Sequence, residues 1–407
     1  MARRIEARAN RDLLVRAREL EAWEVMMPSI LTCTILVPLV AGCAVDARQN
    51  GGAAQQPAGL PFQVEVVADF ESPWAMTFLP DGRMLITEKS GTLYVVSADG
   101  QQRQRVDGIP SVSSEGQGGL MDVVLHPGFT QNRLVYFSYA EAGQGGKGVV
   151  LARGVLDAGA PPVLQKVETL FRASPYVEGD GHFGGRIAFS ADGHLFFTNG
   201  ERQKFEPAQD PKATLGKVLR LQDDGTPAPG NPLVDKGFHP AVWSYGHRNP
   251  LGIAFDASGN LWEQEMGPKG GDEVNLILPS RNYGYPIVSD GDHYDDRPIP
   301  DHDTRPEFEK PKVSWNPVIS PGGLMVYSGK LWPEWTGDLF IGGLSSQALI
   351  RVDVDGRNAR KGDQWPLGER IREPEEGPDG AIWLLEDGRR GGKGRLLKLT
   401  PLGSGSR

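Results

Sequence analysis

The sequence predicts an all-β protein, a six-bladed β-propeller. Three observations indicate this fold. A phrase made of an apolar run, an Asp-Gly or Ser-Gly turn and a second apolar run recurs along the chain, and outside the N-terminus no sustained helical periodicity occurs. The chain also contains 53 Gly and 32 Pro, as expected for many tight turns. A supersecondary unit that recurs in this way indicates a fold built by repetition.

Six copies of the phrase follow one another between residues 61 and 400. The four clearest span 78–89, 189–200, 255–266 and 377–388, and two looser ones span 125–141 and 334–344. Gly in the turn accepts positive φ, which is typical of hairpins, and the flanking Val, Ile, Leu, Phe and Tyr suit strands. Each copy takes about 57 residues, close to the ~40–50 residues of propeller repeats plus loops. Four-stranded blades follow; a β-sandwich array is the alternative, but it calls for linkers that the sequence lacks.

Charge and cysteine content exclude two classes of function. The formal net charge of −9 argues against a nucleic-acid surface. The two cysteines, Cys33 and Cys43, both precede the repeats. The body therefore has neither structural disulfides nor a thiolate metal site.

Residues 1–43 are predicted to be a targeting segment. The apolar run MPSILTCTILVPLVAG is too short for a comfortable membrane span and ends in small residues, which is typical of a signal peptide. Its end, Val-Ala-Gly-Cys, resembles a bacterial lipoprotein box, in which a lipidated Cys43 would attach the protein to the membrane; a plain signal peptide cut nearby is the alternative. Residues 44–60 form a polar, flexible tether, and the propeller is predicted to span 61–402 of an exported, periplasmic protein.

His182 is the candidate general base. It lies in the Gly-rich stretch 179–185, just before a strand-like run, where a ligand can approach the backbone closely. Histidine is the natural base near neutral pH, and Asp180 is expected to orient its ring. A hydrogen-bonded loop histidine is the alternative.

Arg248 and Asn249 are candidates for stabilising negative charge. They lie in the stretch Gly-His-Arg-Asn-Pro, directly before the third clear copy of the repeat. Arginine is a fixed cation and asparagine offers an amide donor, as an oxyanion requires. A structural loop with an arginine–carboxylate pair is the alternative.

A candidate cation site follows in the stretch 265–273. Gly267 and Pro268 bend the backbone so that carbonyls point outward, and Asp272 and Glu273 add carboxylates. Oxygen ligands suit a hard cation, and calcium fits better than zinc because no Cys or paired His accompanies them. An ordinary turn with solvated acids is the alternative.

Arg370 and Arg372 lie on one face of a short strand, because side chains alternate every two residues. Paired arginines suit a polycarboxylate or a phosphate, and a salt-bridged surface strand is the alternative. Gln117, in the Gly-rich loop 115–119, is a further polar candidate.

The G-x-G-x-x-G match at 143–148 precedes a strand-like run, so it predicts a hairpin loop rather than a dinucleotide site. The acidic stretch 289–303 lacks the pattern of an EF-hand and is expected to be a solvated loop at the rim of the site.

Together and in this order, these constellations resemble the soluble quinoprotein glucose/sorbosone dehydrogenase family, and within it the bacterial aldose sugar dehydrogenases. The resemblance spans nearly all of residues 61–400. The matching stretches are 73–76, 78–88, 116–120, 126–127, 182–189, 246–250, 267–275, 282–286 and 370–372. What the resemblance implies is a six-bladed propeller that holds pyrroloquinoline quinone (PQQ) over its central channel, with calcium beside it.

The resemblance also implies roles for the candidates. His182 would take the proton from the anomeric hydroxyl of an aldose sugar while hydride passes to the quinone, and an external quinone or cytochrome would accept the electrons. Arg248 would steady the charge on the quinone oxygen, with Asn249 nearby. The remaining assignments are Gly267 and Pro268 as calcium ligands, Asp272 and Tyr283 near a calcium site, Arg370 and Arg372 on the cofactor carboxylates, and Gln117 at the edge of the site.

One departure from the family stands out. Related enzymes commonly place a Lys for the quinone in the stretch that matches 342–347, and this chain has Ser345 there. The loss of one cation is expected to weaken the hold on a tricarboxylate. Two other functions stay open: a calcium-dependent propeller hydrolase, such as a lactonase, which would need a metal on the channel axis ringed by carboxylates and Asn, and a non-catalytic carbohydrate- or protein-binding propeller.

Overall fold

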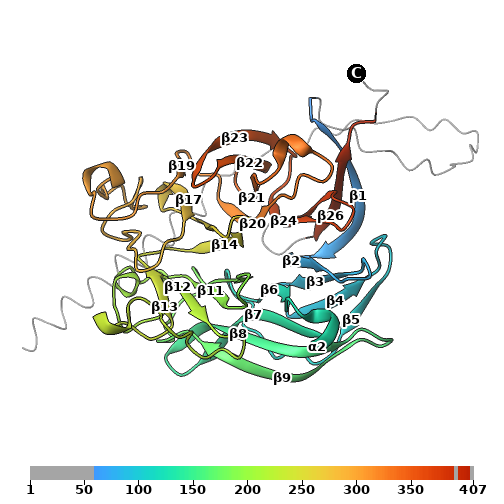
Figure 1. Ribbon diagram of the computed structural model, residues 1–407, viewed down its shortest axis with the longest axis horizontal. Helices are drawn as coiled ribbons and strands as arrows, with labels where there is room; N and C mark the ends of the chain where they lie inside the picture. The colour runs from blue at the N-terminus through green and yellow to red at the C-terminus, as the bar shows by residue number, and fades with distance from the viewer. Residues whose placement is uncertain (1–58, 389–392, 404–407) are drawn as a thin grey trace, which may run out of the picture. The chain divides into compact units, whose positions relative to one another are not determined.

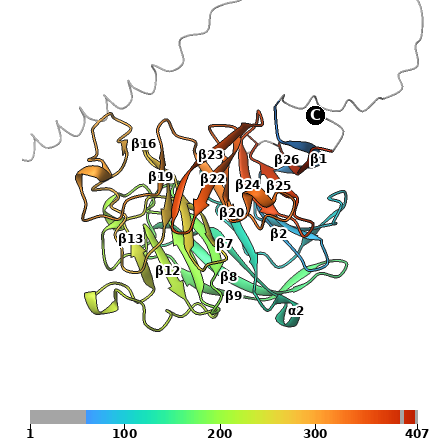
Figure 2. The same cartoon turned by 45° about the horizontal axis from the view of Figure 1, so that its top comes forward.

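The computed structural model describes residues 59–388 and 393–403. The predicted targeting segment and nearly all of the predicted tether lie outside the described residues. Within them, six four-stranded antiparallel sheets form the blades of a propeller (Figures 1 and 2), which confirms the predicted fold. No helix in this part of the chain has both the length and the hydropathy to cross a membrane.

Five blades are built from strands that follow one another along the sequence. The first holds β2 (Pro73–Phe78), β3 (Met84–Glu88), β4 (Thr92–Val96) and β5 (Arg103–Val106). The second holds β6 (Leu120–Leu125), β7 (Leu134–Gly143), β8 (Gly146–Asp157) and β9 (Val163–Arg172). The third holds β10 (Gly184–Phe189), β11 (Leu195–Asn199), β12 (Lys217–Leu221) and β13 (Val242–Tyr245). The fourth holds β14 (Pro250–Phe255), β15 (Leu261–Glu265), β17 (Asp272–Leu276) and β19 (Val313–Trp315), and the fifth holds β20 (Pro321–Val326), β21 (Leu339–Gly343), β22 (Ala348–Asp355) and β23 (Asn358–Pro366).

The sixth blade closes the ring with strands from both ends of the described chain. Its order is β24 (Ile371–Glu376), β25 (Ile382–Glu386), β26 (Lys393–Pro401) and, outermost, β1 (Phe62–Glu71). The first strands of neighbouring blades contact one another all the way round, from β2 through β6, β10, β14 and β20 to β24 and back to β2. The remaining elements are short: β16 (Lys269–Gly270), β18 (Gly291–Asp292), α2 (Phe129–Asn132), and the 3₁₀ turns η1 (Glu206–Ala208), η2 (Val234–Lys236), η3 (His302–Thr304) and η4 (Pro333–Trp335).

Each copy of the repeated phrase occupies the same place in its blade. It covers the turn from the first strand to the second, followed by the second strand itself. In five blades every residue of the second strand is buried, as in β3 and β11, because the strand lies between two neighbouring blades and is covered on both faces. The predicted hairpin at 143–148 is also present, since Gly143 pairs with Gly146 in the turn from β7 to β8.

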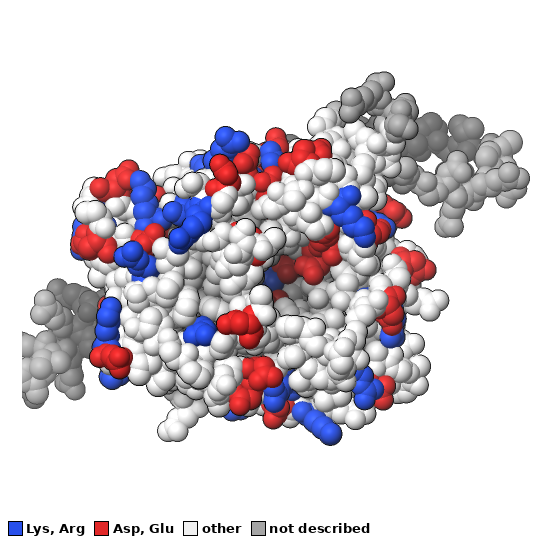
Figure 3. All heavy atoms as spheres, viewed as in Figure 1, with Lys and Arg blue, Asp and Glu red and all other residues white. Residues whose placement is uncertain are grey.

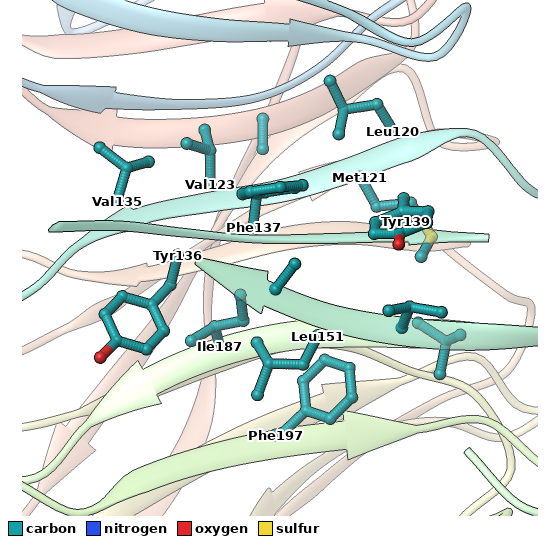
Figure 4. Packing of buried hydrophobic residues seen from close by; sticks show 14 of the residues in the cluster. Leu120, Met121, Val123, Val135, Tyr136, Phe137, Tyr139, Leu151, Ile187 and Phe197 are labelled. Carbon is teal, nitrogen blue, oxygen red and sulfur yellow. The ribbon is translucent and has the colours of Figure 1, made fainter. Parts of the chain in front are cut away.

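The core fills the wedges between blades. Figure 4 shows one such wedge, where Tyr136 and Leu151 of the second blade lie on the side that faces Ile187 and Phe197 of the third. All four are buried, and burying each large apolar side chain stabilises the fold by about 1.5–3 kcal/mol. The packed wedges fix the strand ends around the channel, and these ends carry the candidate site.

Candidate active site

Two cavities lie at opposite ends of the central channel. The upper cavity, about 430 Å³, is lined by residues from the beginnings of the first strands, such as Trp74 and Gly184. The lower cavity, about 310 Å³, is lined by residues from the later parts of the same strands, such as Phe255 and Glu376. Figure 3 shows a hollow with acidic side chains inside it, and acidic side chains also line the lower cavity.

A buried ion group separates the two cavities. The Arg186 guanidinium donates to Glu373 at 2.6 and 2.8 Å and to Asp122 at 3.1 Å, and it stacks 4.2 Å above the Trp74 ring. A calcium-dependent hydrolase would need a metal on the channel axis ringed by free carboxylates and amides. Two of the axial carboxylates are already paired with an arginine, so this arrangement does not favour a hydrolase.

The upper cavity is rich in positive charge. Arg370 and Arg372 both line it, as does Gln117. Arg370 donates to Asp387 through Nε and Nη2, at 2.9 and 2.8 Å, and Arg372 donates to the same carboxylate oxygen at 3.0 Å. Lys89 is a third cation on the wall of this cavity. Arg370 directly precedes the strand β24 and Arg372 lies within it, and both line the same cavity, whereas Lys89 and Asp387 were missed.

His182 lines a smaller outer cavity, and the two residues that follow it, Phe183 and Gly184, line the upper cavity. It is 5 % exposed and has φ of 50°, a region that residues other than Gly seldom adopt. Its backbone N–H donates to Gln117 Oε1 at 2.8 Å, and its ring Nδ1 contacts Glu201 Oε1. Gly200 makes room for this loop, because a Cβ there would lie 2.1 Å from the His182 carbonyl oxygen.

Glu201, rather than Asp180, orients the imidazole. Asp180 pairs instead with Lys147 at 2.5 Å on the surface, so the expectation that it would orient His182 is wrong. Burial lowers the pKa of His182, and the Glu201 hydrogen bond only partly opposes this. Burial alone would raise the pKa of Glu201, but the hydrogen bond and the charge of His182 bring it below its usual value. A neutral imidazole that donates from Nδ1 to a carboxylate leaves Nε2 free as a base.

Arg248 lines the outer cavity together with His182, and the Asn249 side chain accepts from the Gly184 N–H at 3.2 Å. The Arg248 guanidinium donates to the carbonyl oxygens of Met266 and Gly267, at 2.9 and 2.6 Å. The backbone N–H groups of both predicted residues donate to Glu265, which is itself buried. Arg248 Nε and Asn249 Nδ2 are buried without a hydrogen-bond partner. Unpaired buried donors are costly, so both groups are available to a ligand.

The predicted cation stretch forms a tight turn. The carbonyl of Gly267 accepts from Arg248, and Pro268 lines the outer cavity next to His182. The Asp272 carboxylate accepts the N–H groups of Gly267 at 2.8 Å and of Ile319 and Ser320 at 2.8 and 2.7 Å. Burial raises the pKa of Asp272 to about 6. Its oxygens therefore hold the turn in place.

Tyr283 lies below the site. Its hydroxyl donates to the Leu276 carbonyl at 2.6 Å and accepts from Leu278 N–H at 2.9 Å, and its ring stacks on His247 at 4.6 Å. Nearby, the Asn275 amide bridges the buried carboxylates of Glu263, Glu265 and Glu273. Neither Asp272 nor Tyr283 lines the upper or the outer cavity, so the structure does not bring their side chains into either one.

Aromatic side chains line the outer cavity. It has about 230 Å³ and contains His182, Arg248, Phe205, Tyr285 and Tyr294 in its wall. The Tyr294 ring is 72 % exposed and belongs to the stretch 289–303, which the sequence places at the rim of the site. Arg248 donates to the Tyr294 hydroxyl at 3.3 Å. The opening thus combines apolar ring faces with a base and a cation.

The chain is similar to known sugar dehydrogenases in sequence and fold. The family model described as Glucose / Sorbosone dehydrogenase matches residues 70–398. Aldose sugar dehydrogenase YliI of Escherichia coli (strain K12) is 37 % identical over 349 residues, which cover 83 % of this chain and 92 % of that protein. The crystal structure of the soluble aldose sugar dehydrogenase from Escherichia coli in the apo-form has a TM-score of 0.78 at 36 % identity and covers 84 % of this chain and 100 % of that one. The structure of the PQQ-bound aldose sugar dehydrogenase from Streptomyces coelicolor has a TM-score of 0.68 at 28 % identity, and the match covers 85 % of this chain and 100 % of that one.

The chain therefore belongs to the glucose/sorbosone dehydrogenase family of oxidoreductases. The family match covers all six blades, including part of the strand β1 that closes the ring.

Proposed function

We propose that this protein oxidises the anomeric carbon of aldose sugars to lactones, with PQQ as its cofactor and calcium beside it. The observation that carries the proposal is the arrangement around His182. A buried, carboxylate-oriented imidazole lines the aromatic outer cavity, and the residues directly after it, Phe183 and Gly184, line the cationic upper cavity. The relatives from Escherichia coli and Streptomyces coelicolor, named as aldose sugar dehydrogenases, support the same activity.

The upper cavity fits PQQ, a flat tricarboxylate. Its volume of about 430 Å³ lies within the usual range of ligand pockets, about 300–1,000 Å³. Arg370 and Arg372 would hold carboxylates, and Arg372 Nε is buried without a partner. Gln117 and the Trp74 ring complete the wall. When bound, PQQ supplies the two-electron acceptor for the hydride of the sugar.

Calcium would take the carbonyls of Gly267 and Pro268 in preference to the other two predicted ligands, with the Arg248 guanidinium, which donates to the Gly267 carbonyl at 2.6 Å, turning to another acceptor. Calcium takes six to eight oxygen ligands, so two carbonyls need further oxygens from the cofactor or from water. The Asp272 carboxylate already accepts three N–H groups, and the Tyr283 hydroxyl is engaged by two backbone groups. We therefore retain Gly267 and Pro268 as the proposed ligands.

His182 begins the reaction as a general base. Its Nε2 takes the proton of the anomeric hydroxyl, and the Glu201 carboxylate stabilises the imidazolium that forms. The sugar thus loses a proton from the hydroxyl oxygen and a hydride from the anomeric carbon. This leaves a carbonyl group at the anomeric carbon, and the product is a lactone. Arg248 provides fixed positive charge where negative charge develops, and the rings of Tyr285 and Tyr294 offer flat faces to the apolar side of a sugar.

The place of the enzyme in the cell follows from residues outside the described range. We propose that residues 1–43 export the protein to the periplasm, with membrane attachment through a lipidated Cys43. An external quinone or cytochrome would then accept the electrons. A tightly held quinone suits an exported enzyme, because nicotinamide cofactors are scarce outside the cytoplasm.

Dye-linked oxidation of glucose and a panel of other aldoses tests the proposal. The purified protein is assayed with and without PQQ and calcium. We expect activity that requires both, and a loss of about 10²–10⁴-fold in His182→Ala. If no aldose is oxidised under any of these conditions, and PQQ does not raise the melting temperature, the proposed function is wrong.

A further inference from the structure

We propose that Lys89 binds a carboxylate of the cofactor and replaces the cation that Ser345 does not provide. The inference rests on the proposed function and adds a ligand-binding residue to it. Ser345 is exposed, and its hydroxyl lies 3.4 Å from the Val318 carbonyl oxygen. It does not line the upper cavity, whereas Lys89 does, together with Arg370 and Arg372.

The Gly-rich loop 115–119 holds Lys89 in place. Lys89 directly follows β3, and its Nζ donates to the Gly116 carbonyl at 2.6 Å. The first strand of the second blade, β6, begins against it, since Leu120 N–H donates to the Lys89 carbonyl at 3.2 Å. Gly119 has φ of 138°, and a Cβ there would lie 2.6 Å from Lys89 Cγ. Glycine at this position thus leaves room for the lysine stem, which directs the ammonium group to the cavity wall.

The charges around Lys89 are unbalanced. Lys89, Arg370 and Arg372 line one cavity, and among the residues that the structure describes the single carboxylate on its wall, Asp387, accepts from both arginines. Three cations thus face one anion, an excess of two positive charges. Burial lowers the pKa of Lys89, and the positive charge of Arg372 lowers it further. Cations gathered in this way are stabilised by a ligand with several negative charges.

A purely structural role does not account for Lys89. Among the described residues, no carboxylate lies within ion-pair distance of its ammonium group. Glu115, the nearest acidic side chain along the loop, accepts from Lys147 at 3.1 Å and from Ser113 at 2.7 Å. The Gly116 carbonyl satisfies one of three N–H donors, so the others are available to a ligand carboxylate.

Titration of the purified protein with PQQ, in the presence of calcium, tests the inference through affinity rather than turnover. We expect Lys89→Met to weaken PQQ binding by about tenfold to a hundredfold, as for the loss of a hydrogen bond to a charged group. Lys89→Arg should bind within about threefold of the wild type, because the charge is kept. Lys212→Met is the matched control: its Nζ also donates to a glycine carbonyl, at 2.7 Å, but far from the cavity. Its affinity should not change.

PQQ trimethyl ester, which lacks the carboxylate charges, separates charge recognition from a change of shape. Lys89→Met should weaken binding of PQQ but not of the ester. Equal PQQ affinity in Lys89→Met and wild type would overturn the inference while leaving the proposed function intact, and so would an equal penalty for both ligands. Absence of PQQ binding by the wild type would overturn both. Should Lys89→Met lower the melting temperature, Lys89→Gln provides a second neutral variant for the same comparison.

Discussion

The contact between His182 and Glu201 gives the sharpest prediction, the effect of Glu201→Gln. The carboxylate is needed most when His182 becomes an imidazolium. Two unit charges about 4 Å apart interact by about 4 kcal/mol at an effective dielectric constant of 20. Gln keeps a dipole but no charge, so we expect a loss of about half of this, ~2 kcal/mol, or about 30-fold in kcat.

The pH profile provides a second readout for Glu201→Gln. The base must be neutral, so kcat/KM should fall as the pH drops through the pKa of His182. Burial places that pKa below 6.5. Removing the Glu201 charge destabilises the imidazolium and should move the acid limb to still lower pH. The assay is steady-state oxidation of glucose between pH 4.5 and 8, after the melting temperature has shown that the variant is folded.

Glu206→Gln is the matched control, because Glu206 is exposed and lies five residues further along the chain. It should retain wild-type kinetics. The reasoning would be refuted by Glu201→Gln with kcat within twofold of wild type, or by an acid limb that stays in place or moves to higher pH.

Three further variants test how the site is held. Gly200→Ala should lower kcat by at least tenfold, because its Cβ would displace the His182 carbonyl; single-turnover rates measure this. Asp272→Asn should lower the free energy of unfolding by about 1–3 kcal/mol, measured in urea, since one acceptor oxygen cannot satisfy three N–H groups. Glu373→Ala should cost about 3–5 kcal/mol by the same measurement, because it removes the bidentate partner of buried Arg186.

Each of these variants has an outcome that contradicts its explanation. For the glycine, Gly159→Ala is the control, since its Cβ would meet only a surface carboxylate oxygen at 3.3 Å; equal kinetics in the two variants would show that His182 tolerates the displacement. An Asp272→Asn protein of wild-type stability would mean that the carboxylate does not hold the turn. A Glu373→Ala protein as stable as the wild type would show that Asp122 alone suffices for Arg186.

The repeat pattern explains why the fold could be predicted from the sequence. Each of the four clearest copies places an Asp-Gly or Ser-Gly turn between the first and second strands of a blade, and the alignment of copies corresponds to the alignment of blades. The pairing of β1 with β26 could not be predicted in this way, because the closing blade joins strands more than 300 residues apart along the chain. Local sequence patterns predict pairing between strands that are adjacent along the chain, but not between strands that are this far apart.

The same alignment contains the signal for two residues that were missed. Glu88, Glu265 and Glu386 occupy one position, the end of the second strand. The residue after the second strand differs from blade to blade, and four of its occupants line the upper cavity, the charged Lys89 and Asp387 and the apolar Met266 and Leu344. The candidate site thus lies where the copies differ, and reading the copies against one another would have found both charged residues.

Glu201 was missed for another reason. Asp180 is closer to His182 along the chain, and spacing alone favours the near neighbour. The chain reverses between β10 and β11, which brings Glu201 beneath the imidazole and turns Asp180 outward to Lys147. Proximity created by strand pairing is not visible in the spacing of polar residues.

Anaerobic mixing of the PQQ- and calcium-loaded protein with glucose tests the central claim most directly, because it needs no electron acceptor. The absorption spectrum of the bound quinone is followed in the wild type and in His182→Ala. We expect the oxidised spectrum to convert to the reduced one in the wild type, with one lactone formed per quinone, and to persist in His182→Ala although the variant still binds PQQ. Reduction at equal rates in both proteins, or no reduction by any aldose, would contradict the assignment of His182 as the base of an aldose dehydrogenase.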